Sequence, residues 1–340
     1  MRGQVVVDTD LIRLTDQGLY CPVGDFHIDP WRPVLRAVIT HAHGDHARWG
    51  HQAYYATHAS RPLLRRRLSR DALILTADYG HRFRLGDAHV SFHPAGHILG
   101  SAQVRVEHGG RVWVVSGDYK RDSDPTCRAF EVVPCDTFIT EATFALPVFR
   151  WQPVPRVVEE IAAWWGEAAR RGRTAVLFCY ALGKAQRVLA ELLAHTDATA
   201  YLHGAMVPLV DAYREAGVAM LPTAPVSAMP RGHDFAGSLI LAPPSAAGSA
   251  WMKRFRPETT GFVSGWMRIR GNRRRRGYDR GFVISDHVDW QDLLRTVRDT
   301  GASRVLATHG RTDVLVRYLN EVEGIAAEPL ETAYSGEADT

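Results

Sequence analysis

The sequence has few cysteines, no long apolar run and no repeated or low-complexity segment. Only four of its 340 residues are cysteines, and no two of them are spaced as Cys-x-x-Cys. Structural disulfides are therefore not expected. No apolar run reaches the roughly 18 residues that a membrane-spanning helix needs, and residues 1–8 lack the pattern of a signal peptide. We expect a cytoplasmic protein without a membrane partner.

The chain also has little excess charge. Its net charge is +4 at pH 7, with 23% charged and 46% apolar residues, as in a soluble globular protein. Six arginines nevertheless fall within residues 268–276. Clustered arginines bind phosphate in a salt-sensitive way, although a solvated loop is the ordinary alternative for such a run. We predict phosphate contacts for the last four of them, Arg273, Arg274, Arg275 and Arg276.

Side chains that can bind metal are concentrated in the segment His41-Ala-His43-Gly-Asp45-His46. The apolar, β-branched residues 37–40 before it predict a buried strand, so the segment should form the loop at the end of that strand. Imidazoles and carboxylates are the usual ligands of zinc and related divalent metals. Four such groups exceed what one open zinc site needs, so we predict two metal ions close together.

Three further predicted strands end in a ligand residue next to glycine. Residues 90–97 end in Pro-Ala-Gly-His97, residues 111–118 end in Ser-Gly-Asp118, and residues 304–310 end in Thr-His309-Gly. Loops at strand ends can aim several side chains at one point. We therefore expect His97, Asp118 and His309 to join the first cluster.

Together these residues resemble the ligand series of the metallo-β-lactamase fold. The resemblance implies an α/β (α+β) protein with an αββα sandwich, and an orienting role for Asp29 beside the ligands. It implies two divalent ions, zinc or alternatively manganese. Their ligands would be His41, His43 and His97 for one ion and Asp45, His46 and His309 for the other, with Asp118 as the bridge.

Later motifs resemble those of the β-CASP nucleases, a branch of this fold. The segments that begin at Thr140, Ser285 and Thr308 resemble motifs A, B and C of that branch. This implies phosphodiester hydrolysis by a hydroxide that bridges the two metals, with Asp45 and Asp118 in catalytic positions. It also implies that His287 protonates the departing ribose oxygen and that Glu141 orients His287.

Residues 18–33 resemble the bacterial ligase-associated DNA exonucleases, which are relatives of the Artemis-type DNA repair nucleases. This implies a DNA exonuclease in repair, a DNA substrate with single-stranded character, and a functional link to a DNA ligase and a repair helicase. His309 is typical of RNA-cleaving members instead, so an RNA nuclease of the mRNA 3′-end processing or ribonuclease J type is the alternative. Glu141 and His287 argue against a thioester or lactone hydrolase, and the complete ligand series argues against a non-catalytic scaffold.

The predicted elements divide the chain into three segments. Residues 1–150 would form the first part of the metallo-β-lactamase domain, and residues 256–340 its second part with motifs B and C. Residues 151–255 alternate helices and strands, which predicts a parallel sheet and resembles an inserted β-CASP cap. In that cap Gly183 and Lys184 stand at a strand-to-helix turn, where backbone N–H groups and a cation would bind substrate phosphate.

Overall fold

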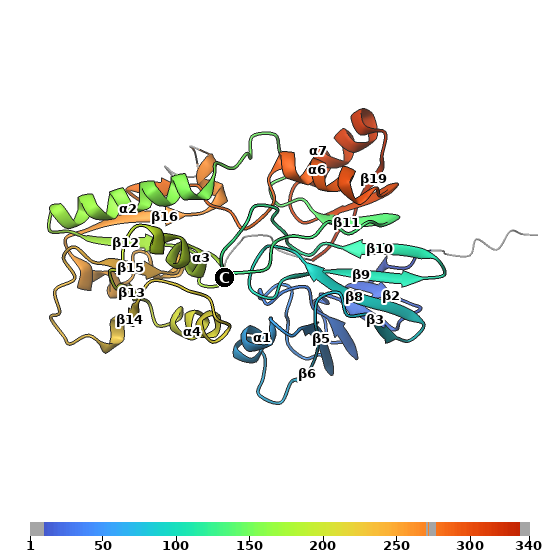
Figure 1. Cartoon of the computed structure of the whole chain (residues 1–340), viewed down its shortest axis with the longest axis horizontal. Helices are drawn as coiled ribbons and strands as arrows, with labels where there is room; N and C mark the ends of the chain where they lie inside the picture. Colours follow the sequence, from blue (N-terminus) through green and yellow to red (C-terminus); the bar gives the residue numbers. More distant parts are fainter. Residues whose placement is uncertain (1–9, 270, 272–276, 334–340) are drawn as a thin grey trace, which may run out of the picture.

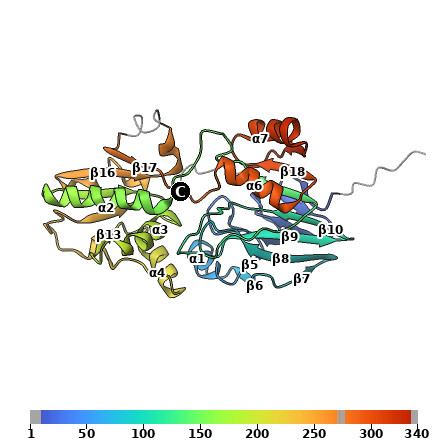
Figure 2. The same cartoon turned by 45° about the horizontal axis from the view of Figure 1, so that its top comes forward.

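The computed structural model describes residues 10–269, 271 and 277–333, and they form two lobes (Figures 1 and 2). The predicted phosphate contacts Arg273 to Arg276 lie outside the described residues. One lobe is built on two sheets and the other on a third sheet. No helix in the described ranges is long and apolar enough to cross a bilayer.

The first lobe contains two sheets. The first sheet has its strands in chain order: β1 (Arg13–Leu14), β2 (Leu19–Cys21), β3 (Phe26–Ile28), β4 (Arg36–Val38), β5 (Ala53–Thr57) and β6 (Leu73–Ala77). The second has the order β19-β18-β11-β10-β9-β8-β7. Its strands are β7 (Phe83–Leu85), β8 (Ala88–Pro94), β9 (Ala102–His108), β10 (Arg111–Val115), β11 (Thr137–Glu141), β18 (Arg304–Thr308) and β19 (Ala326–Pro329).

The alternation of side chains along these strands explains the layers of this lobe. In β10, Trp113 and Val115 face the apolar core between the two sheets, whereas Val114 faces the opposite way, as expected for a period of two. Val114 packs in one cluster with residues of α6 (Trp290–Thr300) and α7 (Thr312–Tyr318). On the other side, α1 (Arg61–Arg67) packs its two buried leucines against the first sheet. The order of layers is therefore helix, sheet, sheet, helix.

The second lobe is an all-parallel sheet with the order β14-β13-β15-β12-β16-β17. Its strands are β12 (Thr174–Phe178), β13 (Ala200–Leu202), β14 (Thr223–Pro225), β15 (Leu239–Ala242), β16 (Glu258–Val263) and β17 (Arg280–Phe282). The helices α2 (Val154–Arg170), α3 (Lys184–Glu191) and α4 (Val207–Glu215) pack on one face. The predicted mixed α/β class is confirmed. The sheet extends past the boundary that we predicted at residue 255, because β16 pairs with β12.

Short helical turns connect these elements. They are η1 (Leu192–Ala194), η2 (Val226–Ala228), η3 (Pro244–Ala246), η4 (Ala250–Phe255), η5 (Gly265–Arg268) and η6 (Leu319–Glu323).

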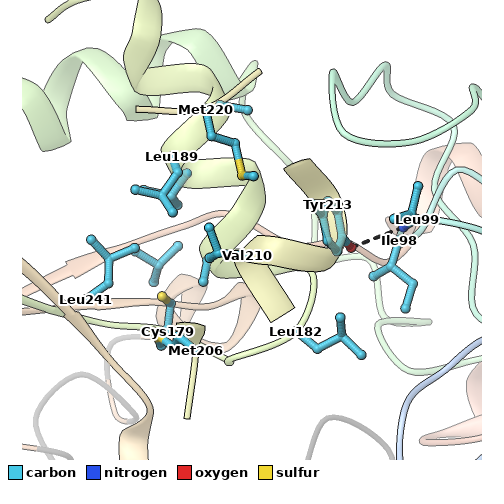
Figure 3. Packing of buried hydrophobic residues seen from close by; sticks show 14 of the residues in the cluster. Ile98, Leu99, Cys179, Leu182, Leu189, Met206, Val210, Tyr213, Met220 and Leu241 are labelled. Carbon is cyan, nitrogen blue, oxygen red and sulfur yellow. Dashed lines mark hydrogen bonds between the residues drawn. The ribbon is translucent and has the colours of Figure 1, made fainter. Parts of the chain in front are cut away.

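The two lobes share an apolar core. Ile98 and Leu99, on the loop after β8, belong to the same buried cluster as Leu182 and Tyr213 of the second lobe (Figure 3). The backbone N–H of Leu99 donates a hydrogen bond of 3.1 Å to the hydroxyl oxygen of Tyr213, which lies on α4. The second lobe is thus packed directly against the loop that carries His97.

Candidate metal centre

The predicted ligands come together where several strands of the first lobe end. Asp118 follows β10, Glu141 ends β11 and His309 follows β18. These three strands are parallel neighbours, so their carboxyl ends meet at one edge of the second sheet. The loop that contains His41 follows β4 of the first sheet, and the loop that contains His97 follows β8.

Positive φ angles in the backbone at this edge allow the ligand-bearing loops to approach one another closely. Gly117 has φ +56°, and a Cβ atom there would lie 2.6 Å from Cβ of Thr40. A side chain at position 117 would therefore separate Asp118 from the loop that begins at His41. His309 itself has φ +59°, a conformation that costs energy for a residue other than glycine and that is concentrated at functional sites.

Three imidazole nitrogens converge at the first part of the site. The Nε2 atoms of His41 and His97 each lie 3.1 Å from Nδ1 of His43. Ligands of a tetrahedral zinc ion with bonds of about 2.0–2.1 Å are separated by about 3.3 Å. The three nitrogens are thus spaced as one zinc ion requires.

The protonation of this group also suits a metal. Burial lowers the pKa of the His43 imidazole to about 4, and it lowers the pKa values of His41 and His97 well below the ordinary value. The rings are therefore neutral at pH 7, as metal-ligating imidazoles must be.

His46 behaves differently from the other histidines. Burial by itself would lower its pKa, but the charges of Asp45, Asp118 and Asp29 outweigh burial and raise the pKa to about 10. In the absence of a metal, a proton on His46 balances these carboxylates. A divalent cation would supply the same positive charge.

Asp118 lies between the two groups of ligands. Its Oδ2 atom is 3.4 Å from Nε2 of His41 and 3.6 Å from Nε2 of His46. Burial raises the pKa of this carboxyl, and its Oδ1 atom is buried without a hydrogen-bond partner among the described residues. A buried, unsatisfied carboxylate oxygen is costly unless a cation binds it, so Asp118 fits a metal position.

Asp45, His46 and His309 form the second group. Their potential ligand atoms lie within 4.8 Å of one another, with 3.7 Å between Oδ2 of Asp45 and Nε2 of His46. The rings of His46 and His309 are stacked, with centroids 5.1 Å apart. The spacing is wider than in the first group, but the donor set is again one that binds divalent metal.

Asp29 makes the contacts expected of an orienting residue. One carboxylate oxygen accepts a hydrogen bond of 2.8 Å from the N–H of Thr40, and the other lies 2.8 Å from Nδ1 of His46. The Thr40 hydroxyl donates to Asp29 at 2.5 Å and lies 3.0 Å from Nδ1 of His41. Asp29 therefore fixes His46 directly and His41 through Thr40, which leaves the Nε2 atom of each ring to face the site.

His287 and Glu141 form a buried pair beside the ligands. Nδ1 of His287 lies 2.8 Å from Oε2 of Glu141, and the other Glu141 oxygen accepts a 2.8 Å hydrogen bond from the N–H of Tyr119. Asp118 Oδ2 is 4.0 Å from Nδ1 of His287. A separation of 2.8 Å is that of a direct hydrogen bond and is shorter than the spacing of ligands around one zinc ion. His287 is thus held next to the ligand cluster through a bond to Glu141.

The sequence is similar to curated proteins of two kinds. Over 307 residues, or 89% of this chain, the sequence is 32% identical to the "Probable DNA ligase" of Opitutus terrae, and the match covers 30% of that protein. It is 32% identical over 117 residues to "Endoribonuclease YSH1" of Gibberella zeae and 30% identical over 122 residues to "Endoribonuclease ysh-1" of Neurospora crassa. These two matches cover 33% and 34% of this chain and 14% of each relative.

The chain thus spans less than a third of the length of these curated relatives. No protein-family model matches it. The fold is similar to the crystal structure of a protein of unknown function from Enterococcus faecalis V583, with a TM-score of 0.57 at 11% identity. That match covers 88% of this chain and 80% of the other. The chain is therefore similar to proteins named as a DNA ligase and as endoribonucleases, and it shares its fold with a solved structure.

The predicted phosphate contact at Lys184 has a different environment from the one expected. The side chain is fully buried, and its Nζ lies 2.9 Å from Oδ2 of Asp286. The turn before α3 is present as predicted, with Gly183 at φ +89°. The Lys184 amine, however, is bound to an internal carboxylate and does not lie on an open surface.

Sequence reasoning missed several residues that orient the ligands. Thr40 connects His41 to Asp29, the carbonyl oxygen of Asp286 lies 2.9 Å from Nδ1 of His97, and the carbonyl oxygen of Leu182 lies 3.3 Å from Nε2 of His43. All three are adjacent to a predicted site residue, which is a usable signal. Asp286 and Leu182 act here through backbone carbonyls, so their residue types carry no signal.

Proposed function

We propose that this chain is a metal-dependent phosphodiesterase of the β-CASP branch of the metallo-β-lactamase fold, and that it degrades DNA from an end. The observation that carries the proposal is the buried His287–Glu141 pair, 2.8 Å apart, beside the converging ligands. A carboxylate-bound imidazole beside the ligands is placed to act as a general acid. Phosphodiester cleavage expels an alkoxide, and such a proton donor accelerates that step.

Two divalent ions, zinc or manganese, would bind at this site. The first would be held by His41, His43 and His97 and the second by Asp45, His46 and His309, with Asp118 shared between them. When bound, such a pair lowers the pKa of water and neutralises the charge of the scissile phosphate. The two groups of converging donors and the position of Asp118 Oδ2, 3.4 and 3.6 Å from their histidines, support this assignment.

The chain's own residues supply the proton. With Glu141 bound to Nδ1, His287 is stabilised as an imidazolium and has its Nε2 proton left to donate. It would transfer that proton to the ribose oxygen that leaves phosphorus. Glu141 in turn is fixed by the N–H of Tyr119, so the direction of the ring is set before substrate binds.

DNA is the proposed substrate because the similarity to the protein named "Probable DNA ligase" extends over 89% of this chain. It also motivates a functional link to a ligase, and we propose cytoplasmic repair as the setting. RNA is the second candidate. The matches to proteins named endoribonucleases cover about a third of the chain, and His309 stands in the second ligand group.

One experiment separates these substrates and modes. Matched single strands of DNA and RNA, each labelled at the 5′ or the 3′ end, are incubated with the protein and zinc or manganese, beside circular single-stranded DNA. We expect progressive shortening of linear DNA while circular DNA stays intact. Cleavage of RNA alone would overturn the DNA proposal, and cleavage of the circle would overturn the exonuclease proposal. Asp118→Asn controls for contaminating nucleases.

A further inference from the structure

The groups that orient the metal-ligating histidines come from both lobes. His41 and His46 are fixed by Thr40 and Asp29, all within the first lobe. His43 and His97 differ, because their outer nitrogens face backbone carbonyls. Nε2 of His43 lies 3.3 Å from the oxygen of Leu182, which precedes α3 in the second lobe.

The second carbonyl belongs to Asp286, in the segment between β17 and α6. Its oxygen lies 2.9 Å from Nδ1 of His97, and its own side chain lies 2.9 Å from the amine of Lys184. Lys184 is two residues beyond Leu182 and begins α3. One ion pair therefore ties together the two carbonyls that orient His43 and His97.

Close packing leaves this turn little freedom. The Lys184 side chain is fully buried and that of Asp286 is 6% exposed. Gly183 lies between Leu182 and Lys184, and a Cβ atom there would be 2.6 Å from Cγ2 of Ile98, the neighbour of His97. Leu182 and Ile98 belong to the shared apolar core (Figure 3).

A second buried ion pair on the same helix provides a natural control. Arg187 lies one turn beyond Lys184, with its NH1 atom 3.3 Å from Oδ2 of Asp124, and it donates a 3.0 Å hydrogen bond to the oxygen of Ser123. Both side chains of this pair are almost fully buried, with 1% and 2% exposure. Arg187 thus joins α3 to the first lobe through the loop after β10. Its charge also acts on the Asp286 carboxylate, less strongly than that of Lys184, but its contacts with Ser123 and Asp124 do not involve a metal-ligating histidine.

We propose that Lys184 is a positioning residue for the first metal ion and not a phosphate contact. Its ion pair with Asp286 holds the carbonyls of Leu182 and Asp286 on His43 and His97. These acceptors keep a proton on the outer nitrogen of each ring and direct the inner nitrogen at the ion. The inference rests on the proposed function only in assuming that the two groups bind divalent ions.

Zinc affinity measured by competition with a chromophoric chelator tests this proposal in the full chain. Loss of an orienting partner costs about 10–100-fold in metal affinity. We expect Lys184→Met to lose about that much for one zinc ion and to bind the other like the wild type. In zinc-loaded wild type, imidazole NMR should show hydrogen-bonded N–H signals from His43 and His97, and Lys184→Met should lose them. Arg187→Met should melt at a lower temperature, keep the affinity for the second zinc ion and lose much less affinity for the first than Lys184→Met.

Asp286→Asn tests the same ion pair from its other end, because it keeps the backbone carbonyl and nearly the same side-chain volume. It should give the same selective loss, and it decides the question if Lys184→Met does not fold. Unchanged zinc binding in these variants, or equal weakening in Arg187→Met, would overturn the proposal, as would a wild type without the first zinc ion. A wild type that binds two zinc ions but degrades no nucleic acid refutes the proposed function alone.

Discussion

Histidine side chains on the two sides of Asp118 have different chemical roles. On one side, the inner nitrogens of His41, His43 and His97 approach one another to 3.1 Å, and burial keeps these rings neutral. On the other side, His287 has a carboxylate 2.8 Å from Nδ1. In the first ligand group the second nitrogen of each ring faces a carbonyl or hydroxyl, which leaves a lone pair for a metal, whereas the carboxylate beside His287 stabilises an extra proton. A carboxylate partner alone does not decide the role, because His46 of the second ligand group also has one, Asp29, 2.8 Å from Nδ1.

The largest effect should come from the residue that both sides share. Asp118→Asn removes the negative charge between the two ligand groups and replaces one carboxylate oxygen by an amide nitrogen, which cannot bind metal. We expect zinc content and DNA cleavage to fall to background, measured by elemental analysis and by strand degradation. Full zinc content in this variant would contradict the bridging assignment.

The next largest effect should come from a change at His287, the proposed proton donor, alone. His287→Gln should slow DNA cleavage by about 10²–10⁴-fold, the usual contribution of a general acid, and leave zinc content unchanged. The outcome is read from single-turnover rates at saturating zinc. Loss of zinc from this variant would show that His287 is a ligand and would remove the distinction between the two sides.

A smaller effect should follow from changing the orienting residue of the ligand side. Asp29→Asn places an amide where His46 Nδ1 now has a carboxylate oxygen at 2.8 Å. We expect zinc affinity to fall by about 10–100-fold, with cleavage largely recovered at high zinc. Cleavage that stays low at saturating zinc would assign Asp29 a role beyond orientation.

The smallest expected effect is the pH dependence of stability in the metal-free protein. Burial lowers the pKa values of seven histidines, to about 4 for two of them, from an ordinary value of 6.5; the seven are His27, His41, His43, His51, His97, His203 and His309. Between pH 6.5 and 4 the unfolded chain therefore binds more protons at these positions, and the free energy of unfolding falls as pH decreases.

Other titratable groups do not reverse this fall in the free energy of unfolding at low pH. Three carboxyls with raised pKa values act in the opposite direction but are fewer, namely Asp118, Glu191 and Asp292. The raised pKa of His46 acts mainly above pH 6.5. Melting curves of chelator-treated protein at pH 7 and pH 5 check the prediction. A melting temperature that is equal or higher at pH 5 would contradict it.

Much of the fold follows from local sequence patterns. The alternation of helices and strands after residue 151 predicted a parallel sheet, and β12, β13 and β15 form one. The strands β16 and β17 were assigned to another segment, because a sheet partner that is distant in sequence leaves no local signal. Their parallel pairing, β12 with β16 and β16 with β17, appears only in the folded chain.

Contacts between residues distant in sequence also limited the prediction of the site. Residue type and position at strand ends predicted that His97, Asp118 and His309 would join the segment 41–46, and these side chains lie together. Glu141 and His287 were expected beside them only from the family resemblance. The same reasoning placed Lys184 on a phosphate, since a Gly-Lys pair at a helix start is ordinarily open to solvent. Its partner Asp286 is about a hundred residues away, and the packing of one lobe on the other turns that cation inward.

The central claim is that His287 donates a proton while the ligand groups bind metal. Two DNA strands, one with sulfur in place of a 3′-bridging oxygen and one with sulfur in place of a 5′-bridging oxygen, test it most directly, because a thiolate leaves phosphorus without needing a proton. We predict that His287→Gln loses about 10²–10⁴-fold on the ordinary strand and little on the strand whose sulfur is the leaving atom, whereas Asp118→Asn loses activity on all three. An equal loss on the ordinary strand and on both sulfur strands in His287→Gln would contradict the account.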